Sequence, residues 1–162
     1  SLAKALGRPA DPKRWATLFL GATRAADFPP GREIAAFDRK GKPLADQDRA
    51  LADIEGVILL DGTWSQAKTL WWRNAWLLKG RRIALKPRRP SLYGQLRREA
   101  RREGLSTIEA AGMTLAALEH KPDIQTALTT TFSTMLKRYQ AARRANPQID
   151  RGQTAEADAP SD

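Results

Sequence analysis

Cysteine is absent from this chain of 162 residues, and histidine occurs only once, at His120. A chain without cysteine has no disulfide framework, no cysteine-ligated zinc site and no thiol nucleophile. A single histidine cannot build a histidine-based metal cluster, and His120 stands before Lys121-Pro122, as is typical of a helix C-terminus. These shortages exclude thiol-dependent and many metal-dependent enzymes, and we expect no bound metal in this chain.

Long apolar segments are also missing. The longest run with the character of a buried segment is Val57-Ile58-Leu59-Leu60, which has the length of a strand. A membrane-spanning helix needs about 20 apolar residues. The chain does not open with a charged segment followed by an apolar one, which is the pattern of a secretory signal. We therefore expect a cytoplasmic protein with no membrane partner.

Acidic residues are scarce beside basic ones: Asp and Glu number 18 and Lys and Arg 28, for a net charge of +10. Such an excess favours a polyanionic partner, because cations neutralise phosphates and release counterions. A generally basic surface is the simpler alternative. However, the segment from Lys79 to Arg102 holds ten Lys and Arg residues and a single acid, Glu99. This concentration predicts a nucleic-acid surface beside a functional site.

Short apolar segments alternate with helical patterns along the chain. The predicted strands cover residues 14–20, 34–37, 57–60 and 82–85, and the predicted helices cover residues 46–54, 63–78, 92–102, 107–119 and 124–145. The alternation predicts one α/β domain over residues 1–145, with a mostly parallel sheet. Residues 146–162, rich in Ala, Pro, Asp and Gln, are predicted to form a disordered tail.

The first candidate site segment is Asp61-Gly62-Thr63-Trp64. A buried strand brings Asp61 to the edge of the sheet, Gly62 permits a sharp turn, and Thr63 can cap the helix that follows. The free N–H groups of a helix start suit an anion or a ligand carboxylate. Asp61 could bind ribose hydroxyls, neutralise a cation or act as a general base. The alternative is an Asp-Gly turn in which Asp61 only caps the helix.

The predicted helix 63–78 carries four tryptophans, and we expect most of them to be core residues. They are Trp64, Trp71, Trp72 and Trp76. One of them could instead form a wall against an adenine or stack on an RNA base.

Two later segments also follow strand ends or begin helices, where ligands bind in open α/β sheets. In Ser91-Leu92-Tyr93-Gly94, Ser91 could cap a helix and Tyr93 could be a core residue or a base-stacking platform. In the segment 105–110, Ser106 or Thr107 would cap a helix whose backbone groups could contact an adenine. Glu109 would then lie in the first turn, close to the pocket.

Taken together, these segments resemble the DTW-domain family. The motif that names the family is matched by Asp61, Thr63 and Trp64, its Ser-x-Tyr…Arg element by Ser91, Tyr93 and Arg97, and its Leu-Ser-Thr-x-Glu-Ala element by Leu105 to Ala110. The motifs occur in the family's order, and the resemblance covers about residues 1–140. Family members usually carry an N-terminal cysteine cluster suggestive of zinc, followed by a His-Pro-x-Glu segment. Neither is present in this sequence, so we expect a domain without its N-terminal segment.

The resemblance implies a SPOUT-like α/β fold, with helices on both faces of the sheet and a C-terminal trefoil knot that holds S-adenosylmethionine. It also implies transfer of the 3-amino-3-carboxypropyl group of S-adenosylmethionine to N3 of a uridine in tRNA, without a metal. Uracil N3 is a weak nucleophile until it loses its proton, so a carboxylate acting as general base would help. Asp61 is the first candidate for this catalytic role and Glu109 the second.

The resemblance and the charge pattern together give two sets of expected contacts. The expected cofactor-binding residues are Leu60, Asp61, Gly62, Thr63, Trp64, Ser91, Tyr93, Leu105, Ser106 and Thr107. The expected tRNA-binding residues are Arg81, Arg82, Lys86, Arg88, Arg89, Arg97, Arg98, Arg101 and Arg102.

Two other functions are compatible with the same sequence. A SPOUT-type RNA methyltransferase would share the fold and the cofactor and would transfer the methyl group, because positioning decides which sulfonium carbon is attacked. A non-catalytic RNA-binding module would need only the basic cluster. The sequence does not decide between a monomer and a homodimer, and it does not identify the uridine.

Overall fold

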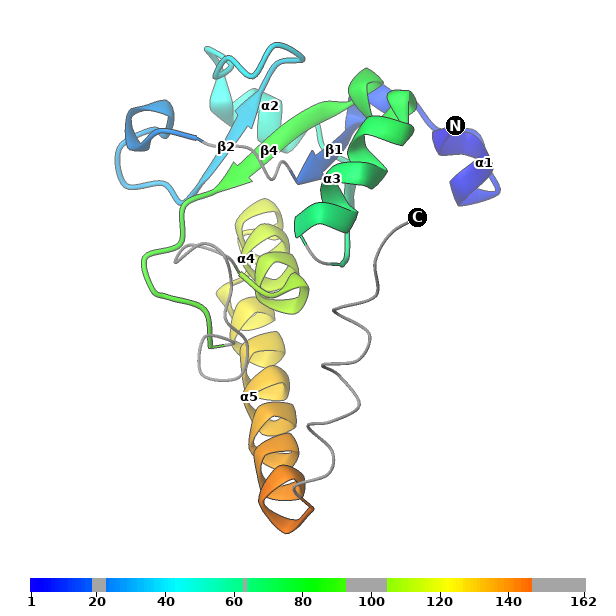
Figure 1. Cartoon of the computed structure of the whole chain (residues 1–162). Helices are drawn as coiled ribbons and strands as arrows, with labels where there is room; N and C mark the ends of the chain where they lie inside the picture. The colour runs from blue at the N-terminus through cyan, green and yellow to red at the C-terminus, as the bar shows by residue number, and fades with distance from the viewer. Residues whose placement is uncertain (19–22, 63, 93–104, 147–162) are drawn as a thin grey trace.

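The computed structural model describes residues 1–18, 23–62, 64–92 and 105–146 (Figure 1). The strands in this part of the chain are β1 (Trp15–Leu18), β2 (Ile34–Phe37), β3 (Gly56–Ile58) and β4 (Arg81–Leu85). The α-helices are α1 (Leu2–Leu6), α2 (Gln47–Ala52), α3 (Trp64–Arg73), α4 (Thr107–Glu119) and α5 (Pro122–Ala145). Short 3-10 helices lie at η1 (Pro12–Arg14), η2 (Ala25–Asp27) and η3 (Ala75–Lys79).

The four strands form one mixed sheet in the order β2-β4-β1-β3. Strand β1 runs parallel to both of its neighbours, and Thr17 lies opposite Ile58 on β3 and Arg82 on β4. Strand β2 runs antiparallel to β4 at the edge of the sheet. Three of the four strands are therefore parallel, as the prediction of a mostly parallel sheet requires, and the edge strand β2 makes the sheet mixed. A short apolar segment has the same pattern in either direction, so the sequence could not reveal the direction of β2.

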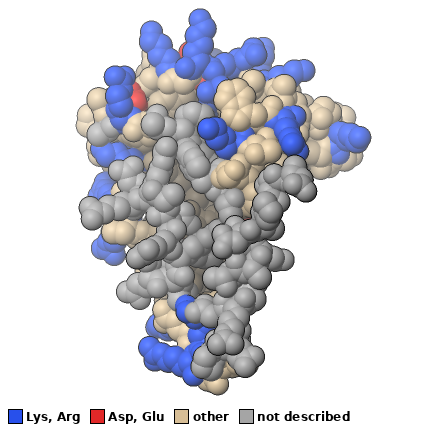
Figure 2. All heavy atoms as spheres, in the orientation of Figure 1, with Lys and Arg blue, Asp and Glu red and all other residues tan. Residues whose placement is uncertain are grey.

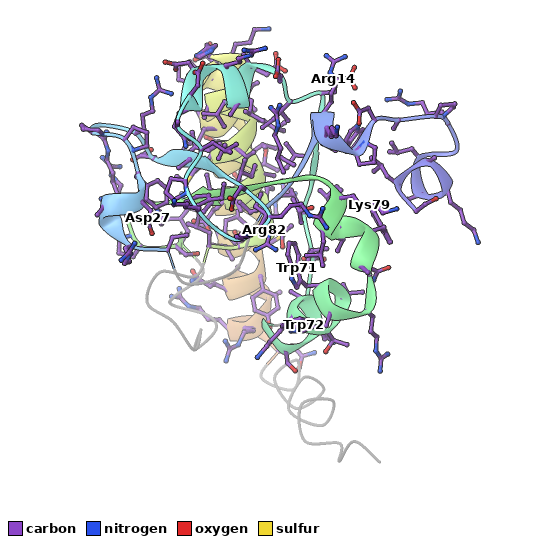
Figure 3. All side chains as sticks on the ribbon, turned by 90° about the horizontal axis from the view of Figure 1, so that it is seen from above. Arg14, Asp27, Trp71, Trp72, Lys79 and Arg82 are labelled. Carbon is purple, nitrogen blue, oxygen red and sulfur yellow. The ribbon has the colours of Figure 1, made fainter. Side chains whose placement is uncertain are left out.

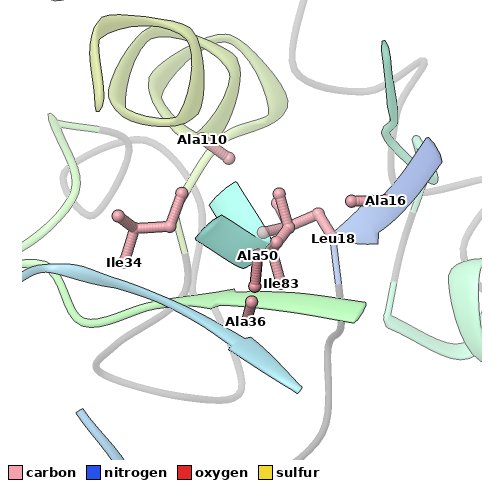
Figure 4. Packing of buried hydrophobic residues seen from close by; sticks show 7 residues of the cluster. All are labelled: Ala16, Leu18, Ile34, Ala36, Ala50, Ile83 and Ala110. Atoms are coloured by element: carbon pink, nitrogen blue, oxygen red, sulfur yellow. The ribbon is translucent and has the colours of Figure 1, made fainter. Parts of the chain in front are cut away.

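One face of the sheet packs against α2 and α4. Side chains from β1, β2 and β4 form this layer with one alanine from each helix (Figure 4): Ala16, Leu18, Ile34, Ala36, Ile83, Ala50 and Ala110. The two helical alanines are small, so α2 and α4 can approach the sheet closely. This packing fixes the position of α4 relative to the ends of β3 and β4, where the candidate site lies.

The opposite face of the sheet is covered by different segments. Phe28 packs there with Phe37, and their ring centroids lie 6.2 Å apart in an edge-to-face arrangement. On β4, Arg82 alternates with the buried Ile83 and lies under Trp71 of α3. Helices therefore lie on both faces of the sheet, with α3 opposite α2 and α4 (Figure 1).

The predicted helix 63–78 is interrupted in the structure. Helix α3 ends at Arg73, and Asn74 adopts a non-helical conformation before η3 begins. The side chain of Asn74 stabilises the break, since its amide donates to the carbonyl of Leu70 and its oxygen accepts from Nε1 of Trp76. Asparagine competes in this way with backbone hydrogen bonds, which explains why the helical pattern continued in sequence but not in structure.

Helices α4 and α5 pack against each other, and the far half of α5 extends away from the sheet (Figure 1). Their connection is sharp because His120 has a φ of 54° and ends α4, as its position before Lys121-Pro122 predicted. The predicted trefoil knot stays a prediction, because the chain between β4 and α4 includes residues 93–104, outside the described residues. The predicted helix 92–102, apart from Leu92, and most of the predicted tail also lie outside them. None of the helices described is long and apolar enough to cross a membrane.

Candidate active site

Asp61 lies just beyond β3, at the edge of the sheet where α3 begins. The turn depends on Gly62, whose φ of 125° is strained for any residue with a Cβ. The carboxylate of Asp61 is exposed, and its Oδ1 accepts a hydrogen bond of 2.5 Å from Oγ1 of Thr107. This bond joins residues that are 46 positions apart in the sequence. Among the described residues, no other hydrogen bond to the Asp61 carboxylate is seen.

The first turn of α4 contains a buried carboxylate, Glu109, which is 9% exposed. Glu109 and Ser106 form a capping box: the Ser106 hydroxyl accepts from the Glu109 N–H, and the Glu109 carboxylate accepts from the Ser106 N–H at 3.0 Å. The carboxylate also accepts from the Ser106 hydroxyl at 2.6 Å, the Ser91 hydroxyl at 2.5 Å and the Leu92 N–H at 2.9 Å. Glu109 therefore ties the Ser91 segment to the start of α4.

The environment of Glu109 keeps it ionised. Burial alone would raise the pKa of its carboxyl, but the hydrogen bonds from Ser106, Ser91 and the N–H groups of Leu92 and Ser106 outweigh burial and lower the pKa. A general base needs a free lone pair and a pKa near the working pH. Glu109 has four donors and a lowered pKa, so its contacts favour a positioning role. Of the two predicted catalytic carboxylates, Asp61 is the one with an accessible oxygen.

A shallow groove of about 470 Å³, open to solvent, adjoins Asp61 along the first two turns of α3. It is lined by Asp61, Ser65, Gln66, Thr69 and Leu70. The last four were missed by the sequence analysis, although Ser65 and Thr69 are separated by four positions and so lie on one face of a helix.

A sequence model of the DTW domain matches residues 6–140. This chain belongs to the DTW-domain family. The resemblance to this family is therefore confirmed. At the start of α4, the motif of Asp61 meets the motif of Leu105 to Ala110. Ser91, the first residue of the remaining motif, is bound there as well.

Three relatives of this DTW-domain chain are each named tRNA-uridine aminocarboxypropyltransferase 2. The protein from Macaca fascicularis is 36% identical over 72 residues, and that from Mus musculus is 38% identical over 72 residues; each match covers 44% of this chain and 24% of the relative. The protein from Drosophila melanogaster is 31% identical over 99 residues, which are 61% of this chain and 39% of the relative. The matches thus span well under half the length of these relatives. No solved structure matches the chain.

The other predicted cofactor-binding residues of the DTW domain occupy three kinds of position. Leu60 is half-buried just before Asp61, and Leu105 packs against the core beside the capping residue Ser106. Thr63, Tyr93 and the side chain of Trp64 lie outside the described residues. Their roles stay predictions. In the part of the chain that the structure describes, no three Asp, Glu or His side chains gather as metal ligands would.

The expectation that most of the tryptophans are core residues is wrong for those whose side chains are described. Trp72 is 71% exposed, and Trp71 and Trp76 are half-buried. Trp71 lies against the sheet with its ring centroid 4.9 Å from Cζ of Arg82 (Figure 3). The helix turns by 100° per residue, so the neighbours Trp71 and Trp72 face different surroundings, Trp71 toward the sheet and Trp72 toward solvent.

The predicted tRNA-binding cations divide by their contacts. Arg81 bonds the carbonyl of Ala50 and the carboxylate of Asp53 at 3.1 Å, which ties β4 to α2 and gives it a structural role. Arg88 is exposed but pairs with Glu33 at 2.8 Å. Burial lowers the pKa of Arg82. An arginine guanidinium keeps its charge in proteins, so a cation lies over the ring of Trp71.

The remaining predicted cations are either exposed or outside the described residues. Lys86 and Arg89 are exposed after β4, whereas Arg97, Arg98, Arg101 and Arg102 lie outside the described residues. In the face of Figure 2, Lys and Arg side chains are spread over the upper part of the molecule, around the sheet, with few Asp and Glu among them. RNA contact by this set stays a prediction.

A second hollow, of about 420 Å³, was not foreseen from the sequence. It lies near the β2 edge and is lined by Arg24, Asp27, Lys40, Gly41, Lys42 and Pro43. Asp27 pairs with Arg24 at 3.2 Å, and hydrogen bonds from Arg24 lower the pKa of its carboxyl. The three cations of this hollow come from two loops that are distant in sequence, so no local pattern could reveal them.

Proposed function

We propose that this DTW-domain chain transfers the 3-amino-3-carboxypropyl group of S-adenosylmethionine to N3 of a uridine in tRNA. The observation that carries the proposal is the junction at the start of α4. There Asp61 bonds Thr107, and Glu109 holds Ser91 and Leu92. Segments of all three family motifs thus lie around one exposed carboxylate. The names of the three relatives support the same reaction class.

The groups around the groove fit the polar parts of S-adenosylmethionine. The carboxylate of Asp61 can accept from ribose hydroxyls or from the ammonium of the methionine part. The hydroxyl of Ser65 can donate to the carboxylate of the methionine part, and Leu70 offers apolar contact. When bound, S-adenosylmethionine would supply the electrophilic Cγ of its methionine part; uracil N3 gains the bond to this carbon, the bond from the carbon to the sulfonium sulfur breaks, and methylthioadenosine leaves. We propose that a C-terminal trefoil knot completes the site.

Asp61 is the general base in this proposal. Thr107 donates to Oδ1 and fixes the carboxylate plane, which leaves Oδ2 to take the proton from uracil N3. Glu109 acts one step away: it holds Ser106, and so the start of α4, where Thr107 is placed. The exposed cations Lys86 and Arg89 bind tRNA phosphates near the site.

The direct test is to incubate the chain with unmodified tRNA and S-adenosylmethionine labelled in the aminocarboxypropyl carbons, with methyl-labelled S-adenosylmethionine in parallel. The proposal expects label in tRNA from the first only. Label from the methyl alone would identify an RNA methyltransferase. Binding of tRNA without any transfer would leave the non-catalytic module as the better description.

The role of Asp61 is tested with Asp61→Asn, which keeps the size of the side chain and removes its basicity. Loss of a general base should reduce the transfer rate about 10²- to 10⁴-fold, with tRNA affinity nearly unchanged. Asp123→Asn is the matched control, since Asp123 is exposed beyond the far end of α4, about 20 Å from Thr107 at 1.5 Å per residue. Equal rates for the two variants would contradict the assignment.

A further inference from the structure

The solvent-facing side of α3 continues from the groove to an exposed aromatic ring. Ser65, Thr69 and Trp72 are separated by four and three positions, so they form one row along the helix. The opposite side of α3 faces the sheet, where Ala67 is buried and Trp71 covers Arg82. Trp72 therefore extends the surface that starts at Asp61, about 10 Å along the helix axis from Ser65.

The exposure of Trp72 has no structural purpose within the described part of the chain. Its side chain is 71% exposed, the highest value among the large exposed hydrophobic residues. Its neighbour Trp71 supplies the contact between α3 and the sheet, with Arg82 4.9 Å from its ring (Figure 3). Tryptophan has a large apolar ring that is normally mostly buried, so a ring this open suits a bound partner.

The charges beside Trp72 indicate the partner. Lys68 precedes it by one helical turn and Arg73 follows it directly, both exposed. No acidic side chain pairs with either cation among the described residues. In the sequence, no Asp or Glu occurs between Asp61 and Glu99. An aromatic ring between cations, without acids nearby, matches a stacked base with phosphates on either side.

We propose that Trp72 is a stacking platform for an unpaired RNA base, and that Lys68 and Arg73 bind the phosphates next to that base. Taking tRNA as the natural RNA rests on the function proposed above. The ring lies too far along α3 for its base to be the one at Asp61, so it stacks a neighbour of the modified uridine. The platform thus requires the target to lie in an unpaired loop, because a paired base offers no free face.

The test compares the affinities of the whole chain for a short single-stranded RNA, for the same RNA in a duplex, and for tRNA, without S-adenosylmethionine. Trp72→Ala should raise the Kd for the single strand and for tRNA about 5- to 150-fold, the range given by loss of one stacked base. Trp72→Phe should keep most of the affinity. The duplex should be affected less than about 2-fold, since its contacts are with phosphates.

Matched controls separate the platform from general effects. Met135→Ala removes another exposed apolar side chain, on α5, and should leave all three affinities unchanged. Lys68→Ala and Arg73→Ala should each lower the slope of log Kd against log salt concentration by about 0.7 for the single strand. Lys137→Ala, an exposed cation on α5, should not.

The platform is overturned if Trp72→Ala leaves single-strand binding unchanged, or weakens the duplex and the single strand equally. The first result would also be obtained if this face docks a protein. Because these measurements involve no transfer, they are independent of the proposed reaction. If Trp72→Ala selectively weakens single-strand binding but the protein transfers no group, the proposed reaction alone is refuted. If the Trp72→Ala variant transfers normally and its RNA affinities are unchanged, the stacking platform alone is refuted.

Discussion

Replacing Glu109 by glutamine should destabilise the fold by an amount that follows from its hydrogen bonds. Two backbone N–H groups bind different oxygens of the carboxylate, Leu92 at Oε1 and Ser106 at Oε2. Glutamine has only one oxygen, so its NH₂ must face one of these donors. Serine hydroxyls can rotate, but a backbone N–H cannot. The stranded N–H costs about 1–3 kcal/mol, and the loss of the charge weakens the other bonds by about 1 kcal/mol more. We expect a total of about 2–4 kcal/mol.

Urea denaturation followed by circular dichroism measures this effect. With a slope of about 2 kcal/mol per molar urea, the midpoint of Glu109→Gln should fall by about 1–2 M at neutral pH. Glu119→Gln is the control at the exposed end of the same helix and should change stability by less than about 0.5 kcal/mol. Equal midpoints for wild type and Glu109→Gln would refute the stabilising role of the hydrogen bonds to Glu109.

The difference in stability between wild type and Glu109→Gln should depend on pH in a direction set by the pKa of Glu109. The pKa of Glu109 in the fold is lowered from its ordinary value of 4.5, so the unfolded chain binds the proton first as the pH falls. Stabilisation by Glu109 is therefore complete above that value and is lost as the pH falls through the lower pKa of the folded state. The difference in free energy of unfolding between wild type and Glu109→Gln should be constant down to about pH 5 and become smaller below it. An undiminished difference at lower pH would contradict stabilisation by the ionised Glu109 carboxylate.

Two further substitutions test the packing around the sheet. Gly56→Ala places a Cβ 2.5 Å from the ring of Trp15, which pairs with it in register, and should cost about 1–3 kcal/mol. Thermal unfolding of the double variant with Trp15→Leu should recover most of that loss, and no recovery would mean that the ring is not the obstacle. Trp71→Leu removes the contact with Arg82 and should cost about 1–2 kcal/mol in urea unfolding. Trp72→Leu next to it, whose ring is exposed, should change the free energy of unfolding by less than about 0.5 kcal/mol; similar losses for both would contradict the orientation of α3.

Much of the fold could be predicted because its signals are local. Ser106 followed by Glu109 is a capping box, and α4 begins at Thr107 with both hydrogen bonds of that box formed. The strand at 34–37 and the sharp end of α4 at His120 were likewise readable from neighbouring residues. These features depend on backbone geometry over a few positions, which the sequence encodes directly.

Features that depend on distant contacts could not be predicted. The direction of β2 is fixed by its pairing with β4, far along the chain. The break at Asn74 required knowing that its side chain bonds both Leu70 and Trp76. Arg81 belonged to a basic run, but its contact with Asp53 of the α2 region makes it a structural residue. Charge density along a sequence does not tell which cations are already paired.

The assignment of roles to the two carboxylates also needed the structure. From the sequence, Asp61 and Glu109 were both candidates for the base, since each belongs to a family motif. In the fold, Glu109 is buried and accepts four hydrogen bonds, whereas Asp61 is exposed and accepts one from the described residues. A saturated carboxylate holds its neighbours in place, and an unsaturated one can take a proton. Under the proposed function, the two acids therefore have different roles: Glu109, in the first turn of α4, fixes the turn that presents Thr107, and Thr107 orients Asp61, which follows β3.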